Sequence, residues 1–191
     1  METTAAILLR KIKLTESSLI VTWFTETHGK LKTVAKGARR PKSAFAGRLD
    51  LFFAAEITYS RSSKSELHGL REVAVRDSRE GLRMQYERTQ MAAYFVELVE
   101  MTTEFEHAVP EVYDLLRRAL DYLDKGAPNR RAMLHFESQL SQLLGLTGEN
   151  NLDADPAQAI VRLSGGLPKD RAKILKSLPH GPTPAATKVG G

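Results

Sequence analysis

The sequence contains no cysteine among its 191 residues. This absence excludes disulfide bonds, thiol nucleophiles and every zinc or iron–sulfur site that depends on thiolate ligands. Long apolar runs are absent as well, because the first run, AAILL at residues 5–9, is short and has no basic segment before it. Such a run does not suffice for a signal peptide or a membrane span. We therefore expect a cytoplasmic protein without a metal site, a cofactor or a membrane contact.

Motifs for catalysis are also missing. The chain has neither a GxxxxGK[ST] nor a GxGxxG element, and its five histidines show no paired spacing. Glu104 and His107 have the Glu-x-x-His spacing of di-metal helical bundles, but no second such motif accompanies them. We therefore expect no enzyme and no catalytic residue. A nuclease that uses Glu97, Glu100 and Glu104 is an alternative, which incubation of labelled strands with Mg²⁺ or Mn²⁺ would test.

Acidic residues are scarce in the first quarter of the chain. Residues 1–48 hold ten Lys or Arg and three Asp or Glu, whereas residues 49–191 hold eighteen basic and twenty acidic residues. The formal net charge of +5 therefore arises at the start of the chain. One-sided clustering of cations is the electrostatic pattern that binding to nucleic acid or another polyphosphate requires. We predict a polyanion partner, with a merely solvated charged surface as the alternative interpretation.

The clustered cations lie within residues 29–48, which read GKLKTVAKGARRPKSAFAGR. The first part alternates and places Lys30, Lys32 and Lys36 on one face of an extended strand. Gly37 and Pro41 then disfavour regular structure, so the charges would continue onto a loop beside that strand. The predicted polyanion-binding residues are Lys30, Lys32, Lys36, Arg39, Arg40, Lys42 and Arg48.

The chain also divides by its hydrophobic periodicity. Five β-rich runs separated by turn residues predict strands at residues 4–14, 18–24, 30–36, 51–59 and 66–75. Five short strands with little room for helix between them predict a small antiparallel barrel or meander. Apolar residues then recur at helical spacing, which predicts helices over residues 78–103, 110–125, 130–144, 156–163 and 168–178. The fold class is therefore α+β, with a mildly acidic helical half.

Three stretches resemble the bacterial RecO family of recombination mediators, namely ESSLIVTWFTETHGKLKTVAKGARRPKS, GLREVAVRDSREGLRMQYERTQMAAYFVELVE, and LLRRALDYLD with FESQLSQLLGL. The likeness runs from about Ile7 to Leu146. It implies an N-terminal OB-fold over residues 1–79, an all-α helical domain over residues 80–178 and a flexible tail over residues 179–191. Family members often carry a four-cysteine zinc site, which this chain cannot form.

The resemblance also implies a function. Such a protein would bind single- and double-stranded DNA, anneal complementary strands, and help to load RecA onto strands coated by single-strand-binding protein, together with RecR, in the bacterial nucleoid. By position, the KGARRPK segment would place Lys36, Arg39, Arg40 and Lys42 on the DNA-binding face. An RNA-binding OB-fold module that acts on ribosomal or transfer RNA is the alternative, which competition between DNA and RNA strands would test.

Two further groups of residues complete the predicted sites. Phe45, in a loop among cations, is the predicted aromatic platform for base stacking. Trp23, Phe52 and Phe53 lie in apolar runs and are predicted to fill the barrel core. The resemblance implies that the helical half binds the acidic, phenylalanine-ended tail of single-strand-binding protein in an apolar pocket beside a cation. The available cations are Arg117, Arg118, Arg130 and Arg131.

Overall fold

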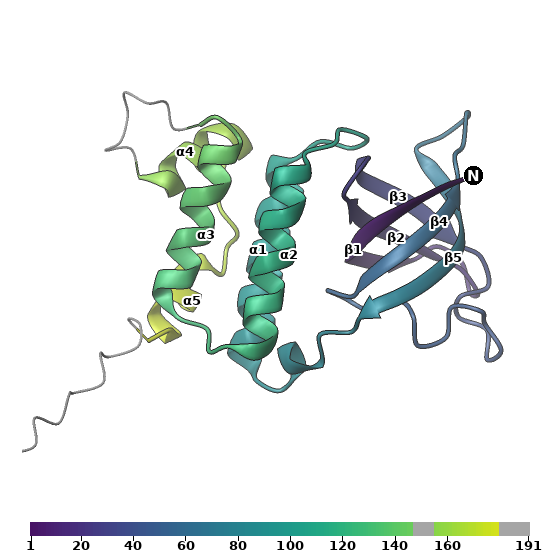
Figure 1. Cartoon of the computed structure of the whole chain (residues 1–191), viewed down its shortest axis with the longest axis horizontal. Coiled ribbons are helices and arrows are strands. Elements are labelled where there is room, and N and C mark those ends of the chain that lie inside the picture. Colours follow the sequence, from purple (N-terminus) through teal and green to yellow (C-terminus); the bar gives the residue numbers. More distant parts are fainter. Residues whose placement is uncertain (147–154, 180–191) are drawn as a thin grey trace, which may run out of the picture.

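The computed structural model of the chain describes residues 1–146 and 155–179. Figure 1 shows the strands gathered at one end of the molecule and the helices at the other, with α1 and α2 between the barrel and α3. The tail that was predicted over residues 179–191 lies, from residue 180 onward, outside the described residues. Within them, no helix is long and apolar enough to cross a membrane.

The strands form a closed barrel. They are β1 (Glu2–Lys13), β2 (Leu19–Thr25), β3 (Gly29–Ala35), β4 (Ala54–Ser60) and β5 (Leu67–Asp77). Their order around the barrel is β1-β2-β3-β5-β4. Every pair is antiparallel except β3 with β5, which is parallel. A closed five-stranded barrel of this kind is an OB-fold, so the predicted fold of the N-terminal half is confirmed.

Of the three aromatic residues predicted to fill the barrel core, only Trp23 belongs to the cluster inside the barrel. Trp23 is fully buried, and its Nε1 donates a 2.9 Å hydrogen bond to Oγ1 of Thr33 inside the barrel. Phe52 is buried instead in the cluster that the barrel shares with the helices, and Phe53 is buried but belongs to neither cluster, so the predicted place of these two residues in the barrel core is wrong. The fourth strand, however, begins at Ala54 rather than at Leu51. Phe52 has a φ of 70°, which is incompatible with a strand and places residues 51–53 in a turn instead.

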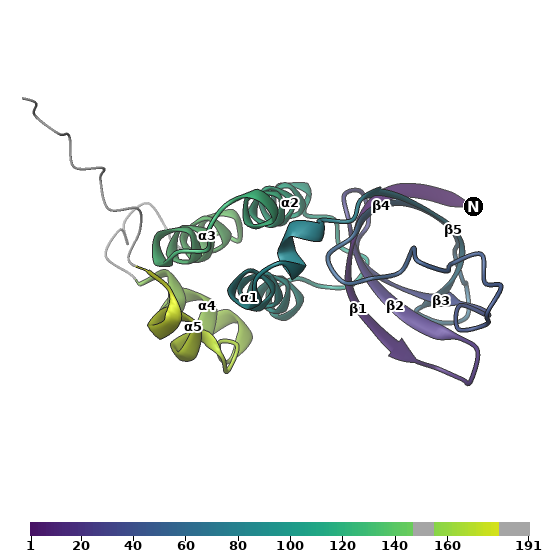
Figure 2. The ribbon, with the colours of Figure 1, turned by 90° about the horizontal axis from the view of Figure 1, so that it is seen from below.

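The helical half begins with a short 3₁₀ helix, η1 (Glu80–Arg83). The α-helices that follow are α1 (Tyr86–Thr102), α2 (Pro110–Lys125), α3 (Arg130–Leu143), α4 (Pro156–Ser164) and α5 (Arg171–Ser177). Two predicted starts are confirmed: Pro110 occupies the first turn of α2, and Asn129 Oδ1 accepts a 2.9 Å hydrogen bond from the Ala132 amide at the start of α3. Figure 2 looks along the helices and shows α2 and α3 in one row, with α1, α4 and α5 in another.

The first long helix starts later than predicted. It begins at Tyr86 rather than near residue 78, because Arg79 adopts a left-handed conformation with φ 46°. The amide of Arg79 donates a 2.8 Å hydrogen bond to Oδ1 of Asp77, which stabilises a turn in place of a helix. Tyr86, the first residue of α1, is 66% exposed. Asp77, a residue type that often caps helices, therefore stabilises a turn here rather than the start of a helix.

A continuous apolar core joins the barrel to the helices. Ile7, Leu9 and Phe24 point out of the barrel and belong to the same buried cluster as the inner faces of α1, α2 and α3. A second cluster, which includes Trp23 and Ile57, fills the barrel itself. Because strand side chains alternate between the two faces, β1 and β2 serve both clusters at once. The barrel therefore presents its remaining surfaces from a fixed position relative to the helices.

Candidate nucleic-acid interface and helical pocket

The start of β3 is not an exposed cation surface. Side chains on β3 alternate as predicted, with Leu31, Thr33 and Ala35 buried in the barrel. Lys30 is on the other face but is only 5% exposed, and its Nζ donates a 2.6 Å hydrogen bond to the carbonyl oxygen of Glu100. Burial lowers the pKa of Lys30. Its predicted place on an open phosphate-binding face is therefore wrong.

The cover over Lys30 comes from the connection between α1 and α2. The Lys30 Nζ lies 4.6 Å and the Lys32 Nζ 4.3 Å from the ring centroid of Phe105, which are cation–π distances. The Glu106 amide donates a 2.9 Å hydrogen bond to the carbonyl oxygen of Lys30. These partners are about seventy residues away in the sequence, so the pattern of β3 alone gave no sign of them.

Lys32 lies in a groove of about 660 Å³ between the barrel and α1. Its Nζ is 3.8 Å from a carboxylate oxygen of Glu66. The charged residues that line the groove are three cations and three carboxylates, namely Arg10, Lys30, Lys32, Glu66, Glu97 and Glu100. Because these charges balance, the groove has no excess positive charge with which to attract a polyanion.

The remaining predicted cations gather on one loop between β3 and β4. We call residues 36–48 the cation loop, and its exposed cations are Lys36, Arg39, Arg40, Lys42 and Arg48. Arg39 lies 4.0 Å from a carboxylate oxygen of Glu16. Within residues 1–146 and 155–179, the other four have no carboxylate oxygen within 4.0 Å. The loop therefore carries a local excess of positive charge that the described part of the chain does not neutralise.

Phe45 does not serve as an exposed stacking platform. It lies in the middle of the cation loop, but its side chain is only 8% exposed. It belongs to the cluster that fills the barrel, together with Trp23 and Val73. The prediction of a stacking role is wrong because the loop turns this one side chain inward, although its sequence neighbours are small or charged.

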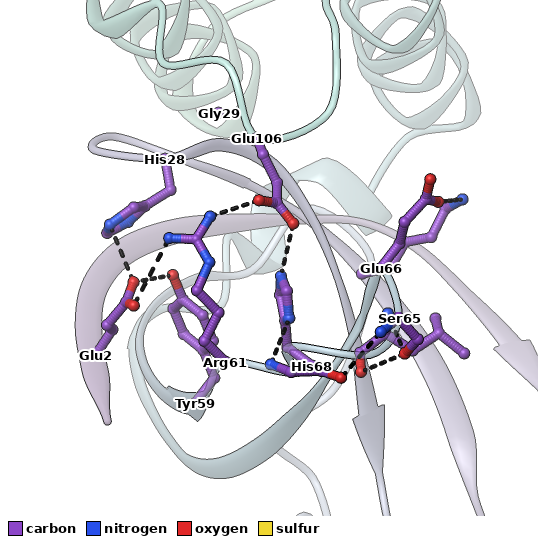
Figure 3. Close-up of polar contacts among 12 residues, drawn as sticks. Glu2, His28, Gly29, Tyr59, Arg61, Ser65, Glu66, His68 and Glu106 are labelled. Atoms are coloured by element: carbon purple, nitrogen blue, oxygen red, sulfur yellow. Dashed lines mark hydrogen bonds and ion pairs between the residues drawn. The ribbon is translucent and has the colours of Figure 1, made fainter.

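A polar network joins the barrel to the α1–α2 connection (Figure 3). Glu106 pairs with Arg61 from the β4–β5 tip and accepts a 3.1 Å hydrogen bond from Nε2 of the buried His68. The Nδ1 of His68 accepts a hydrogen bond from the Ser62 amide, which leaves Nε2 as the donor. The hydrogen bond from Arg61 lowers the pKa of Glu106. Sequence reasoning missed this network because its members come from two loops and from strand β5, far apart in the sequence.

The same network reaches the first strand. Glu2 accepts a 2.6 Å hydrogen bond from the Tyr59 hydroxyl, which lowers the Glu2 pKa, and lies 3.1 Å from His28 Nε2. Next to His28, Gly29 has φ 66°, and a Cβ there would lie 1.9 Å from the carbonyl oxygen of His107. Only glycine permits so close an approach of the two backbones. We call this network the clasp, and its residues are Glu2, His28, Tyr59, Arg61, His68 and Glu106. Together with the α1–α2 connection, the clasp covers the start of β3.

The helical half contains a pocket of about 460 Å³ between α1, α2 and α3. Its apolar lining includes Phe95, Leu115 and Phe136. Its polar lining consists of Arg118, Tyr122, Asn129, Arg131 and His135. An apolar pocket with cations at its rim can hold an apolar side chain that lies next to a carboxylate.

Of the four predicted cations of the helical half, two line this pocket and two do not. Arg118 and Arg131 line it. Arg117 instead pairs with Asp114 at 2.6 Å and with Asp121 at 3.2 Å. Arg130 Nη2 donates a 2.8 Å hydrogen bond to the Leu175 carbonyl oxygen. The structure therefore separates these adjacent arginines into two rim residues and two residues with local structural contacts.

The two arginines that line the pocket differ in whether a carboxylate of the chain pairs with them. Arg118 Nε donates a 2.7 Å hydrogen bond to Oδ2 of Asp114, so part of its charge is compensated. Arg131 is exposed and has no carboxylate oxygen within 4.0 Å in the part of the chain that the structure describes. It is therefore the better placed of the two to bind an incoming carboxylate.

The acidic residues of α1 do not gather into a metal site. Glu100 pairs with Arg10 at 2.8 Å, and Glu104 follows the end of the helix as an exposed residue. Across residues 1–146 and 155–179, no group of three or more His, Cys, Asp or Glu side chains is arranged to hold a metal ion. The arrangement that the nuclease alternative requires is not found among these residues.

Comparison with known proteins gives two family matches. The family described as "Recombination protein O N terminal" matches residues 1–79, and "Recombination protein O C terminal" matches residues 83–149. α4 and α5 follow the end of the second match.

Similar curated proteins carry the name "DNA repair protein RecO". The protein from Desulfatibacillum aliphaticivorans is 36% identical over 147 residues, which is 76% of this chain and 57% of the relative. That from Syntrophus aciditrophicus is 30% identical over 142 residues, or 74% of this chain and 55% of the relative. That from Salinibacter ruber is 36% identical over 145 residues, or 75% and 55%. The matched part of the chain spans just over half the length of these relatives.

Proposed function

Because the chain belongs to the recombination protein O family, we propose that it is a DNA repair and recombination mediator that acts by binding, without a covalent step. It binds single- and double-stranded DNA and anneals complementary strands. With RecR, it assists the loading of RecA onto strands coated by single-strand-binding protein. The observation that supports DNA binding most directly is the cation loop, with Lys36, Arg40, Lys42 and Arg48 exposed and without a carboxylate partner among the described residues.

Phosphate neutralisation explains why such a surface suits annealing. Lys and Arg contacts to phosphates release counterions and supply affinity that does not depend on base sequence. Two complementary strands repel each other through their phosphates, and a cationic loop that contacts both reduces that repulsion. The bases stay free to pair because the loop presents no exposed aromatic ring, its single one, Phe45, being buried.

The helical pocket supplies the second contact. We assign to it the acidic, phenylalanine-ended tail of single-strand-binding protein, with the phenyl ring among Phe95, Leu115 and Phe136 and the carboxylates at Arg131 and Arg118. In Figure 1 the barrel lies at one end of the molecule, and the pocket helices α1, α2 and α3 lie beside it, with α3 farthest from the barrel. One molecule can therefore hold the tail and a DNA strand at the same time.

An annealing assay on strands precoated with single-strand-binding protein tests this function. The full chain should accelerate annealing, and a variant with Lys36→Ala, Arg40→Ala and Lys42→Ala should lose most of the acceleration. The matched control replaces Arg162, Lys173 and Lys176, three exposed cations of α4 and α5, so that the net charge changes equally. Equal losses in both variants would mean that net charge, not the cation loop, is responsible. Stronger binding to RNA than to DNA of equal length would favour the RNA-binding alternative.

A further inference from the structure

The cation loop has a regular backbone of successive turns. Gly37 and Gly47 have positive φ angles of 70° and 69°, which allow the chain to reverse. Four hydrogen bonds link each amide to the carbonyl three residues before it, at 3.0 to 3.1 Å, and join Arg40 to Gly37, Ser43 to Arg40, Ala46 to Ser43 and Arg48 to Phe45. The loop therefore has a defined internal structure of its own.

One side chain fastens the middle of this loop to the barrel. Phe45 is buried in the barrel cluster, while Ala44 and Ala46 on either side of it are exposed. The loop cannot leave the barrel surface without exposing this ring to water, which is unfavourable for an aromatic side chain. Phe45 thus holds the cations on either side of it at a constant place on the barrel.

Arg39 fastens the beginning of the loop. Its Nη1 donates a 3.0 Å hydrogen bond to the Glu16 carbonyl oxygen and lies 3.5 Å from that of Thr15, both in the turn between β1 and β2. The Arg39 amide donates a further 3.0 Å hydrogen bond to the Ser17 carbonyl oxygen. Within residues 1–146 and 155–179, no side-chain hydrogen bond of this kind engages Arg40 or Lys42. Arg39 therefore holds the loop against the β1–β2 turn, whereas the neighbouring Arg40 makes no such contact among the described residues.

We propose that Phe45 and Arg39 are positioning residues of the DNA interface, and that Lys36, Arg40 and Lys42 are the residues that contact phosphate. This inference rests on the proposed DNA binding. A loop that is already ordered loses little conformational freedom when DNA binds, so its cations contribute more of their attraction to affinity. Phe45 and Arg39 act through the loop and do not touch the DNA.

The first experiment compares Phe45→Ala and Phe45→Leu in binding to a single-stranded oligonucleotide over a range of salt. Phe45→Ala should weaken binding by about tenfold, whereas Phe45→Leu, which keeps a buried apolar anchor, should stay within about threefold of the wild type. Neither variant removes a charge, so the slope of log affinity against log salt should not change. Replacing Lys36, Arg40 and Lys42 with Ala should instead reduce that slope by about 2, at about 0.7 per phosphate contact.

Trypsin reports whether the loop has come loose. At a temperature at which circular dichroism shows the barrel intact, cleavage within residues 36–48 should be faster in Phe45→Ala than in the wild type. Wild-type affinity in a variant whose loop is cut rapidly would overturn the inference. So would Phe45→Ala binding that changes in salt slope as the triple cation variant does.

The second experiment uses Lys replacements and does not depend on the stability of Phe45→Ala. Lysine keeps the charge, but its ammonium group does not reproduce the position of the guanidinium nitrogen Nη1 that contacts the carbonyl oxygens of Glu16 and Thr15. Arg40→Lys should therefore bind DNA within about twofold of the wild type, and Arg39→Lys should weaken binding by about fivefold at unchanged salt slope. Equal effects at the two positions would overturn the assignment. If the triple cation variant binds DNA normally, the proposed DNA interface itself fails, whatever Phe45 and Arg39 do.

Discussion

The buried guanidinium of Arg79 donates a 2.9 Å hydrogen bond from Nε to Oδ1 of Asp121, and this contact joins the end of the barrel to α2. Arg79 is only 1% exposed, and its Nη1 also donates to the carbonyl oxygen of Phe52. One side chain thereby links β5, the turn before β4 and the second long helix. This junction adds polar contacts to the apolar core that joins the barrel, which carries the cation loop, to the helices that form the pocket.

Arg79→Ala should lower the free energy of unfolding by about 3 kcal/mol, because the half-buried Asp121 carboxylate and the Phe52 carbonyl oxygen each lose a donor. Urea denaturation followed by circular dichroism measures the change. The control is Arg83→Ala, which removes a more exposed arginine that pairs with Asp50 at 2.9 Å and should cost less than about 1 kcal/mol. Similar losses in both variants would show that the junction contributes no more than a surface ion pair.

A second buried ion pair holds the last described helix in place. Arg171 of α5 donates from Nε and Nη2 to the two carboxylate oxygens of Glu137, both at 2.8 Å, and Glu137 is 1% exposed. The Tyr94 hydroxyl donates to the same carboxylate. Arg171→Ala leaves this buried charge without its main partner and should cost about 3–5 kcal/mol. Lys173→Ala, an exposed change on the same helix, should cost less than about 0.5 kcal/mol.

That comparison also tests whether α5 is integral to the fold, since it follows the end of the family match. Stability unchanged by Arg171→Ala would mean that α5 is held only loosely.

Stability should fall in acid through the clasp around Glu106. The hydrogen bond from Arg61 holds the Glu106 pKa below its ordinary value of 4.5, so the ionised carboxylate stabilises the folded state. This contribution is fully present above the ordinary pKa and is lost as the pH falls through the lowered one. Glu106→Gln should therefore be less stable than the wild type at pH 7 and lose less stability below about pH 4.5.

Thermal unfolding at a series of pH values measures both curves. Glu104→Gln is the control, because Glu104 is exposed two residues away and has no cation within 4.0 Å among the described residues. It should follow the wild-type curve. Parallel curves for Glu106→Gln and the wild type would contradict the role of the clasp.

Local patterns predicted much of this fold. Alternation around Trp23 and the apolar spacing of α2 placed strands and helices within a few residues of their observed bounds, because burial of one face depends on the element's own sequence. The cap at Asn129 was predictable for the same reason, since its partner amide is three residues away. The number and spacing of the runs left a barrel or a meander open, and the family resemblance implied the OB-fold that the closed barrel confirms.

Contacts between distant segments were not predictable in this way. The alternation of side chains along β3 predicts that Lys30 is exposed. Phe105 and Glu100, which are about seventy residues away in the sequence, nevertheless cover it. Phe45 lies among cations but turns into the barrel. The sequence could name the cations of both candidate sites, but only the fold shows which of them have partners of their own.

Arg130 and Arg131 show the same limit on α3 and allow the sharpest test of the helical pocket. They are adjacent and chemically identical, but Arg131 lines the pocket whereas Arg130 donates to the Leu175 carbonyl oxygen. Arg131→Ala should weaken binding of an acidic peptide that ends in phenylalanine by about tenfold, because a charged hydrogen bond contributes about 1.5–3 kcal/mol. Arg130→Ala should leave peptide affinity within about twofold and lower stability by about 1 kcal/mol instead.

Fluorescence anisotropy of the labelled peptide and urea denaturation of each variant give the two measurements. Both variants remove one positive charge from the same turn of the helix, so any difference between them reflects the place of the side chain and not the net charge. A peptide that ends in alanine should bind weakly to all three proteins, because the apolar floor formed by Phe95, Leu115 and Phe136 would have no ring to hold. If Arg130→Ala weakens peptide binding as much as Arg131→Ala does, the peptide binds through general attraction to α3, and the pocket is not its site.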